Sequence, residues 1–130
     1  MMNSINLNLL TKSLDGLWLR QKLTMDNIAN YSTPGYKSKF VDFESNLKEK
    51  IKDVNSNGAA SKSVLNEEIE NSNMIIGESD DVSARLDENN VDLEKENLEL
   101  AKTQLQYMYT VTEMNSYFSK LESVISEGKK

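Results

Sequence analysis

The chain has 130 residues, of which 38% are hydrophobic and 28% charged, and its 21 acidic and 15 basic side chains give a formal net charge of −6. This length suits one modest domain, and the acidic balance disfavours nucleic acid and anionic membrane surfaces as partners. No apolar run is long enough for direct membrane insertion, we expect no secretory signal peptide, and the absence of cysteine and histidine excludes disulfides, a thiolate nucleophile and zinc sites of the usual kind.

Residues 1–34 are predicted to form a long amphipathic helix and the turn that ends it. Apolar side chains recur at alternating spacings of three and four, which is the period of one helix face. These positions are Leu7, Leu10, Leu14, Leu17, Met25 and Ile28. Gly16 lies inside the pattern, where glycine destabilises a helix by about 1 kcal/mol relative to alanine.

The helix is expected to end near Asn30, because the only proline of the chain follows it closely. Thr33 precedes that proline and is therefore disfavoured in the helical conformation. Pro34 and Gly35 suit the two central positions of a type II turn, in which glycine supplies the positive φ. We predict a sharp turn followed by extended chain through residues 36–43.

Residues 35–90 form a middle segment that is expected to be extended and loop-rich. Between 45 and 90 there are ten acidic and five basic side chains, with many asparagines and serines. This composition and the lack of a sustained period are typical of loops or partly disordered chain. Two short apolar runs, residues 64–65 and 74–76, are candidates for the strands of a short β-hairpin.

Residues 91–130 have the clearest helical pattern, an apolar heptad with polar residues only at Asn97 and Gln104. The heptad consists of Leu93, Leu100, Tyr107, Val111, Met114, Phe118, Leu121 and Ile125. A second apolar row lies beside its first half and consists of Leu98, Ala101, Leu105 and Met108. The helix is therefore apolar on two faces and can contact two neighbours.

The acidic residues that open this helix allow two interpretations. Asp92, Glu94 and Glu96 follow Asn90, which is the predicted N-cap. Carboxylates in a first turn complement the helix dipole. A metal or acid–base site would need other ligands or a shifted carboxylate, and the sequence indicates neither. We therefore predict no metal, no cofactor and no catalytic site, and a protein that is not an enzyme.

The predicted fold is mainly α, with the two long terminal helices paired as a coiled-coil-like hairpin. A lone hairpin leaves much of this apolar surface exposed, so neighbouring subunits are expected to cover it. The predicted subunit contacts are Leu7, Leu10, Leu14 and Leu17 in the first helix, and Leu100, Tyr107, Val111, Met114, Phe118, Leu121 and Ile125 in the last.

The end of the first helix also carries a recognisable motif. The run Asn-Ile-Ala-Asn-x-x-Thr-Pro-Gly-Tyr from residue 27 resembles the N-terminal motif of the bacterial flagellar axial proteins, the rod and hook subunits. The runs Val-Asp-Phe-Glu from residue 41 and Asn-Val-Asp-Leu-Glu-Lys-Glu from residue 90 are similar to the proximal rod branch of that family. The motif residues are Asn27, Ile28, Ala29, Asn30, Thr33, Pro34, Gly35, Tyr36, Asp42, Phe43, Asn90, Asp92, Leu93 and Glu96.

The resemblance implies a structural role in the flagellar basal body. A proximal rod subunit would assemble through its terminal helices into the hollow drive shaft, which transmits torque and passes exported subunits. The implied partners are other rod proteins, the adaptor between the rod and the MS ring, further copies of the chain and, transiently, the flagellar export gate. The implied location is the rod, reached from the cytoplasm through the flagellar type III apparatus.

Two interpretations remain open for the segment after the turn. Phe43 and Leu47 match the Phe-x-x-x-hydrophobic spacing by which early flagellar export substrates are thought to engage the export gate. Phe43 can equally be an anchor that packs this segment onto the helices.

The alternative to a rod subunit is a small helical secreted interaction module or an export chaperone. The Trp-x-Gly turn of small secreted helical proteins is not found, because Gly16-Leu17-Trp18 has the reverse order inside a predicted helix. A chaperone would be a rigid monomer, whereas isolated amphipathic helices gain most of their stability from packing.

Overall fold

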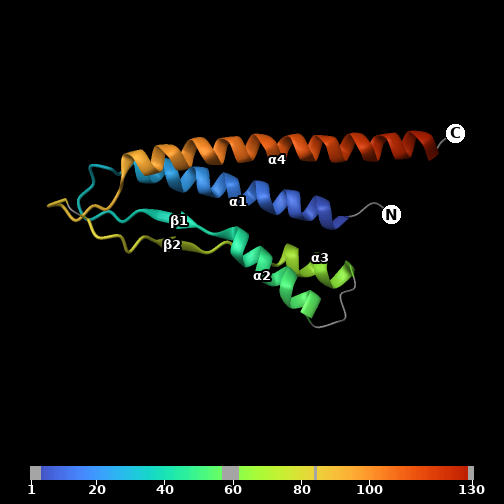
Figure 1. Ribbon diagram of the computed structural model, residues 1–130, viewed down its shortest axis with the longest axis horizontal. Coiled ribbons are helices and arrows are strands. Elements are labelled where there is room, and N and C mark those ends of the chain that lie inside the picture. Colours follow the sequence, from blue (N-terminus) through green and yellow to red (C-terminus); the bar gives the residue numbers. More distant parts are fainter. Residues whose placement is uncertain (1–3, 57–61, 84, 129–130) are drawn as a thin grey trace.

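The computed structural model describes residues 4–56, 62–83 and 85–128. Two long helices, α1 (Ser4–Ala29) and α4 (Leu93–Gly128), lie antiparallel and side by side (Figure 1). An arm lies beside α1 and comprises β1 (Lys39–Val41), α2 (Phe43–Ser56), α3 (Lys62–Glu70) and β2 (Ile76–Glu78). This arrangement confirms the predicted mainly α fold with paired terminal helices.

The two terminal helices differ in length. α4 has 36 residues and α1 has 26, so α4 is longer by about 15 Å at 1.5 Å per residue. Figure 1 shows its C-terminal end reaching beyond the N-terminal end of α1. Phe118 and Ile125, both predicted contacts, lie towards that end and are about half exposed, at 45% and 53%.

The interpretation of the middle segment as loop-rich was wrong for two stretches, which form α2 and α3. In α2, Phe43, Leu47 and Ile51 do recur at helical spacing, but the polar composition around them was interpreted as loop. α3 has only nine residues and shows no sustained period. Short helices depend on tertiary contacts for their stability, and here α2 packs on α3 while α3 packs on α1. Ile69 of α3 is fully buried in this packing.

The predicted β-hairpin was wrong in its pairing, and one residue of the predicted strands, Ile76, lies in a strand. Residues 64–65 belong to α3 and not to a strand. β2 shares only Ile76 with the second predicted run, residues 74–76, and its partner is β1, in the segment that follows the Pro-Gly turn. The pairing is antiparallel, with Lys39 opposite Glu78 and Val41 opposite Ile76.

The seam between α1 and α4 is partly polar, and it includes residues that the heptad did not predict. Asn97 and Gln104, the predicted polar core positions, are exposed. The residues immediately before them, Glu96 and Thr103, are buried instead. The heptad could not reveal this, because Glu96 is held inside by hydrogen bonds to residues far away in the sequence.

The apolar core is small and lies where α1, β1 and the start of α2 meet. It consists of Leu17, Leu23, Val41 and Phe43. The Phe43 ring lies directly over Gly16, where an added Cβ atom would be 2.3 Å from Phe43 Cδ1. Gly16 is therefore required by packing, and Phe43 is an anchor of the arm in the folded chain.

Candidate functional site

The turn after α1 has the predicted geometry. The Tyr36 N–H donates to the Thr33 carbonyl at 3.3 Å, and Gly35 between them has a φ of 70°. Positive φ at the third residue is the mark of a type II turn. The Gly35 N–H also donates to the Asp87 carbonyl at 2.7 Å. The turn is thus tied to the loop that precedes α4.

Asn27 joins α1, β1 and α4 through one buried amide. Its side chain is 1% exposed. The Nδ2 group donates to the Lys39 carbonyl at 2.8 Å and to Glu96 Oε2 at 3.1 Å. The Oδ1 atom accepts from the Lys39 N–H at 2.9 Å and from the Tyr36 hydroxyl at 3.0 Å. Two donors and two acceptors exhaust what an asparagine amide can offer.

Glu96 has a more specific role than a charge that complements the helix dipole. It is 8% exposed, and its Oε1 accepts from the Ser38 hydroxyl at 2.6 Å while Oε2 accepts from Asn27. A buried carboxylate needs such partners to offset its lost hydration. Glu96 and Asn27 lie 69 residues apart in the chain, and their hydrogen bond joins the motif run at residues 27–36 to the run at residues 90–96.

Asn89 was not among the predicted residues, although it is fully buried. Its Nδ2 group donates to the carbonyls of Asn30, Tyr31 and Thr33 at 2.8, 3.1 and 2.8 Å. Helix ends leave carbonyls without partners, and here the two N–H groups of one side chain are shared among three carbonyls at the end of α1 and in the turn. Its position just before the motif run at residues 90–96 was the only signal in the sequence.

Asn90 is not the N-cap of α4, and that prediction was wrong. Its Oδ1 accepts from the Ser38 N–H at 2.7 Å, and its Nδ2 donates to the Ser79 carbonyl at 2.9 Å. The cap is Asp92, whose Oδ1 accepts from the N–H groups of Glu94 and Lys95 at 3.1 and 3.2 Å. Asn90 could not cap the helix because its amide holds β1 and the chain after β2 together.

Arg20 was also missed, although it binds the end of β1 and the start of α2 and so attaches the arm to α1. Its guanidinium makes two hydrogen bonds to Glu44, at 2.7 and 2.6 Å, and donates to the Val41 carbonyl at 2.9 Å. It lies over the Phe43 ring, 4.9 Å from the centroid. The hydrogen bond to Glu44 raises the pKa of Arg20. A lone arginine on a helix face gives no signal of this in a sequence.

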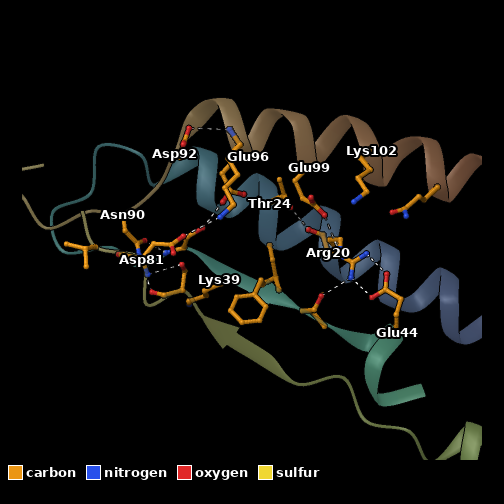
Figure 2. A pocket seen from close by; sticks show the side chains of 18 residues that line it. Arg20, Thr24, Lys39, Glu44, Asp81, Asn90, Asp92, Glu96, Glu99 and Lys102 are labelled. Atoms are coloured by element: carbon orange, nitrogen blue, oxygen red, sulfur yellow. Dashed lines mark hydrogen bonds and ion pairs between the residues drawn. The ribbon is translucent and has the colours of Figure 1, made fainter. Parts of the chain in front are cut away.

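A groove of about 710 Å³ runs between α4, α1 and β1 (Figure 2). Arg20, Lys39 and Lys102 lie among its basic side chains, and Glu44 and Glu99 among its acidic ones. In the described ranges 4–56, 62–83 and 85–128, no group of three or more acidic side chains could hold a metal ion. Over the same residues, no helix has the length and apolar character of a membrane span. In the groove, Arg20 forms ion pairs with Glu44 and Glu99, so charges of both signs lie side by side there.

Asp42 of the second motif run is the N-cap of α2. Its Oδ1 accepts from the Ser45 N–H at 3.1 Å, and this hydrogen bond lowers the pKa of Asp42 below its ordinary value of 3.8. A carboxylate cap of this kind stabilises a helix through its own hydrogen bond and through the helix dipole.

We expect Asp42→Ala to lower the free energy of unfolding by about 1 kcal/mol near neutral pH. Because the folded state has the lower pKa, the stabilisation is complete above the unfolded pKa and is lost as the pH falls through the folded pKa. Urea unfolding at neutral pH and near pH 3 checks this. The difference between the two proteins should shrink at the lower pH, and Asp42→Asn, a neutral cap, should show no such change.

The remaining motif residues lie near the place where α1 ends, the arm begins and α4 starts. Ile28 and Leu93 are partly buried, and Ala29 and Pro34 are exposed. Leu47, the second residue of the export-gate spacing, is partly buried in α2. The motifs at residues 27–36, 41–44 and 90–96 thus meet at one place, where α1 ends, the arm begins and α4 starts.

The predicted contact residues divide into three groups. Leu17 is buried in the core of the chain itself. Phe118 and Ile125 are exposed towards the end of α4. The others are partly buried along the pair of helices, namely Leu7, Leu10, Leu14, Leu100, Tyr107, Val111, Met114 and Leu121.

The second row of α4 forms an exposed apolar face. Leu98, Leu105 and Met108 are 71%, 56% and 66% exposed, and Ala101 between them is exposed as well. With about 100° of rotation per residue, this row lies on the side of α4 opposite the buried Thr103. One side of α4 is therefore covered by α1 and the opposite side is left open.

The total surface is larger than that of a compact chain of this mass. The chain exposes 9041 Å², whereas a compact monomer of its mass, 14.8 kDa, exposes about 7,000 Å². Among the described residues, the buried apolar side chains are Leu17, Leu23, Val41, Phe43, Ile69 and Val91. An elongated shape with so small a core is typical of a subunit that completes its packing in an assembly.

Comparison with known proteins agrees with the motifs. The chain is 35% identical over 111 residues to the flagellar basal body rod protein FlgB of Bacillus subtilis. The alignment covers 85% of this chain and 85% of that protein. No family model matches the chain.

Proposed function

The chain belongs to the FlgB family of flagellar basal body rod proteins, and from this we propose that it forms the proximal rod by packing α1 and α4 against neighbouring subunits. It is a structural rod subunit of the basal body. Its association with other flagellar rod proteins follows from the family. The arrangement of side chains supports packing as its mode of action, without a reaction to catalyse.

The observation that carries the proposal is the pair of opposite faces on α4. The face towards α1 is buried or partly buried, and the row of Leu98, Leu105 and Met108 is exposed on the other side. An exposed apolar row of this length on a helix is a contact surface for a further element. Head-to-tail contacts that do not close on themselves generate a helical array, which is the geometry that a shaft requires.

We propose further that the packed helices surround a hollow shaft, which transmits torque and lets exported subunits pass. The proposed neighbours are other rod proteins, the adaptor between the rod and the MS ring, and copies of this chain. Their contacts would involve the leucines of α1 and the apolar side chains of α4 together. Stiffness would come from close side-chain packing along both helices.

The chain is proposed to leave the cytoplasm through the flagellar type III apparatus. Phe43 and Leu47 are the residues proposed to engage the export gate. Because Phe43 is buried against Gly16 in the folded chain, that engagement would require the arm to be detached or unfolded. Subunits would then fold fully only after export, in contact with their neighbours.

Leu105→Asp tests the role of the exposed face. The side chain is 56% exposed, so the isolated protein should keep its helical content and stability within about 0.5 kcal/mol. Assembly should fail, because a carboxylate would be buried without a partner at the subunit interface. The measurements are motility of the bacterium and recovery of rods in purified basal bodies.

The matched control is Gln104→Asp, which adds the same carboxylate one residue away and about 100° around the helix. Gln104 is exposed and lies outside the apolar row. We expect this variant to assemble and to support motility. Normal motility and normal rods in the Leu105→Asp strain would refute the proposal.

A further inference from the structure

β1 has partners on both of its edges. The side chains of α1 cover the edge that points away from β2. Asn27 binds the N–H and the carbonyl of Lys39, at 2.9 and 2.8 Å, and Arg20 binds the Val41 carbonyl at 2.9 Å. Two side chains of α1 thus take the place of a neighbouring strand. The sheet is closed on this side.

β2 has a partner on one edge only. The Ser79 N–H donates to the Ser38 carbonyl at 2.7 Å and continues the antiparallel pairing with β1. Because backbone groups alternate along a strand, those of Ile76 and Glu78 point to the opposite side. Figure 1 shows β2 on the side of β1 that faces away from α1 and α4. Among the described residues, no hydrogen bond covers this outer edge.

The outer edge is protected only by its length of three residues and by the charge of Glu78. Proteins commonly block such edges with lysine, proline or a bulge. Residues 72–83 contain no lysine and no proline. Ile75 and Ile76 are 69% and 49% exposed on this extended stretch. An open ladder edge beside exposed apolar side chains favours the addition of another strand.

The charge near this edge indicates the chemistry of the partner. A hollow of about 490 Å³ adjoins the end of β2 and is lined by Glu78, Asp80, Asp81 and Glu88. The hollow also has Lys37 among its lining residues, and its ammonium group donates to the Glu88 carbonyl. The negative side chains outnumber the positive one. A basic segment would therefore be favoured over an acidic one.

We infer that the outer edge of β2 binds an extended, basic segment of a neighbouring protein as a third strand. An apolar residue of that segment lies beside Ile76, and a lysine or arginine lies beside Glu78. This contact surface lies on the arm and is distinct from the apolar row of α4.

A short synthetic peptide in which valine and lysine lie two residues apart, as in Val-Thr-Lys, is the probe, because one can then lie beside Ile76 and the other beside Glu78. It is titrated against the full chain by calorimetry. We expect binding, and a loss of at least about tenfold when glutamate replaces the lysines. The same peptide with every backbone amide methylated cannot donate to the ladder and should not bind. Amide exchange measured by NMR should slow at Ile76 and Glu78 when the unmethylated peptide is present, while Gly77 is unchanged.

Two variants of the chain test the edge directly. Ile76→Pro removes the outward N–H and keeps the bonds of Gly77 and Ser79 to β1, as proline does on edge strands. We expect it to bind the peptide at least about tenfold more weakly, whereas the matched control Ile76→Val binds within about twofold of the unmodified chain. Glu78→Lys should weaken binding by a similar factor through charge repulsion.

The exchange measurement on the unmodified chain does not depend on whether Ile76→Pro folds. Equal binding of the methylated peptide would overturn the inference, because attraction between charges alone would then explain the contact. Binding without slower exchange at Ile76 and Glu78 would place the peptide elsewhere and would also overturn it. So would a failure of the unmethylated peptide to bind.

Discussion

Replacing Asn27 with leucine should lower the free energy of unfolding by about 3–5 kcal/mol, the largest effect that we expect from one residue. Leucine has the same branching and number of side-chain heavy atoms, and its larger methyl groups leave no room for a water molecule to replace the amide. The N–H and carbonyl of Lys39, the Tyr36 hydroxyl and Glu96 Oε2 would each lose a partner. Unsatisfied buried polar groups destabilise a protein by about 1–3 kcal/mol each.

Urea unfolding followed by circular dichroism measures this effect. The control is Asn97→Leu, because Asn97 is exposed on α4 and the same substitution there should change the stability by less than about 0.5 kcal/mol. If Asn27→Leu does not fold, its helical signal is lost under conditions in which Asn97→Leu is native. That result also shows the expected destabilisation. Equal unfolding midpoints for the two variants would show that the junction is not held by Asn27.

Gly16→Ala is expected to destabilise the protein by about 1–3 kcal/mol, although helix propensity alone predicts a gain of about 1 kcal/mol. The opposite sign arises because the new methyl group would lie 2.3 Å from Phe43 Cδ1. The Phe43 ring is buried between α1 and Arg20 and cannot easily move aside. The variant should therefore loosen the attachment of the arm to α1.

The same substitution in two other backgrounds isolates the contact. Gly128→Ala is the control, since no atom lies within 4 Å of a Cβ at that position, and it should be neutral or slightly stabilising. In a Phe43→Leu background, Gly16→Ala should lose much of its effect, because the two sites are coupled through direct contact. Stabilisation by Gly16→Ala in the unmodified chain would contradict the close packing of the ring on the helix.

Both predictions concern the attachment of the arm to the terminal helices. Asn27 and Arg20 bind the edge of β1 that points away from β2, and the Phe43 ring fills the space above Gly16. Each of these contacts links α1 to residues that follow the turn at 33–36. The motif residues therefore build a rigid junction from which both the helix pair and the arm extend, and the exposed faces of both can meet neighbours in a fixed geometry.

Elements with a strong local signal were predicted correctly. The Pro-Gly turn was found because Pro34 fixes its own φ angle and Gly35 readily adopts the positive φ that the turn requires. The long helices were found because their apolar period extends over many turns. α3 was missed because nine residues are too few to show a period, and α2 was missed because its polar composition outweighed the helical spacing of Phe43, Leu47 and Ile51. The pairing of β1 with β2 was missed because 34 residues separate the two strands.

The sequence by itself determined the family, the two long helices and the turn between α1 and the arm, because motif order, apolar period and proline geometry are local properties of the chain. The tertiary structure alone decided that Glu96 and Thr103 lie inside, that Asn89 satisfies three carbonyls of the turn, and that Gly16 must remain without a side chain. These outcomes depend on atoms brought together from distant parts of the chain. A hydrogen bond between residues 69 positions apart has no counterpart in any local pattern.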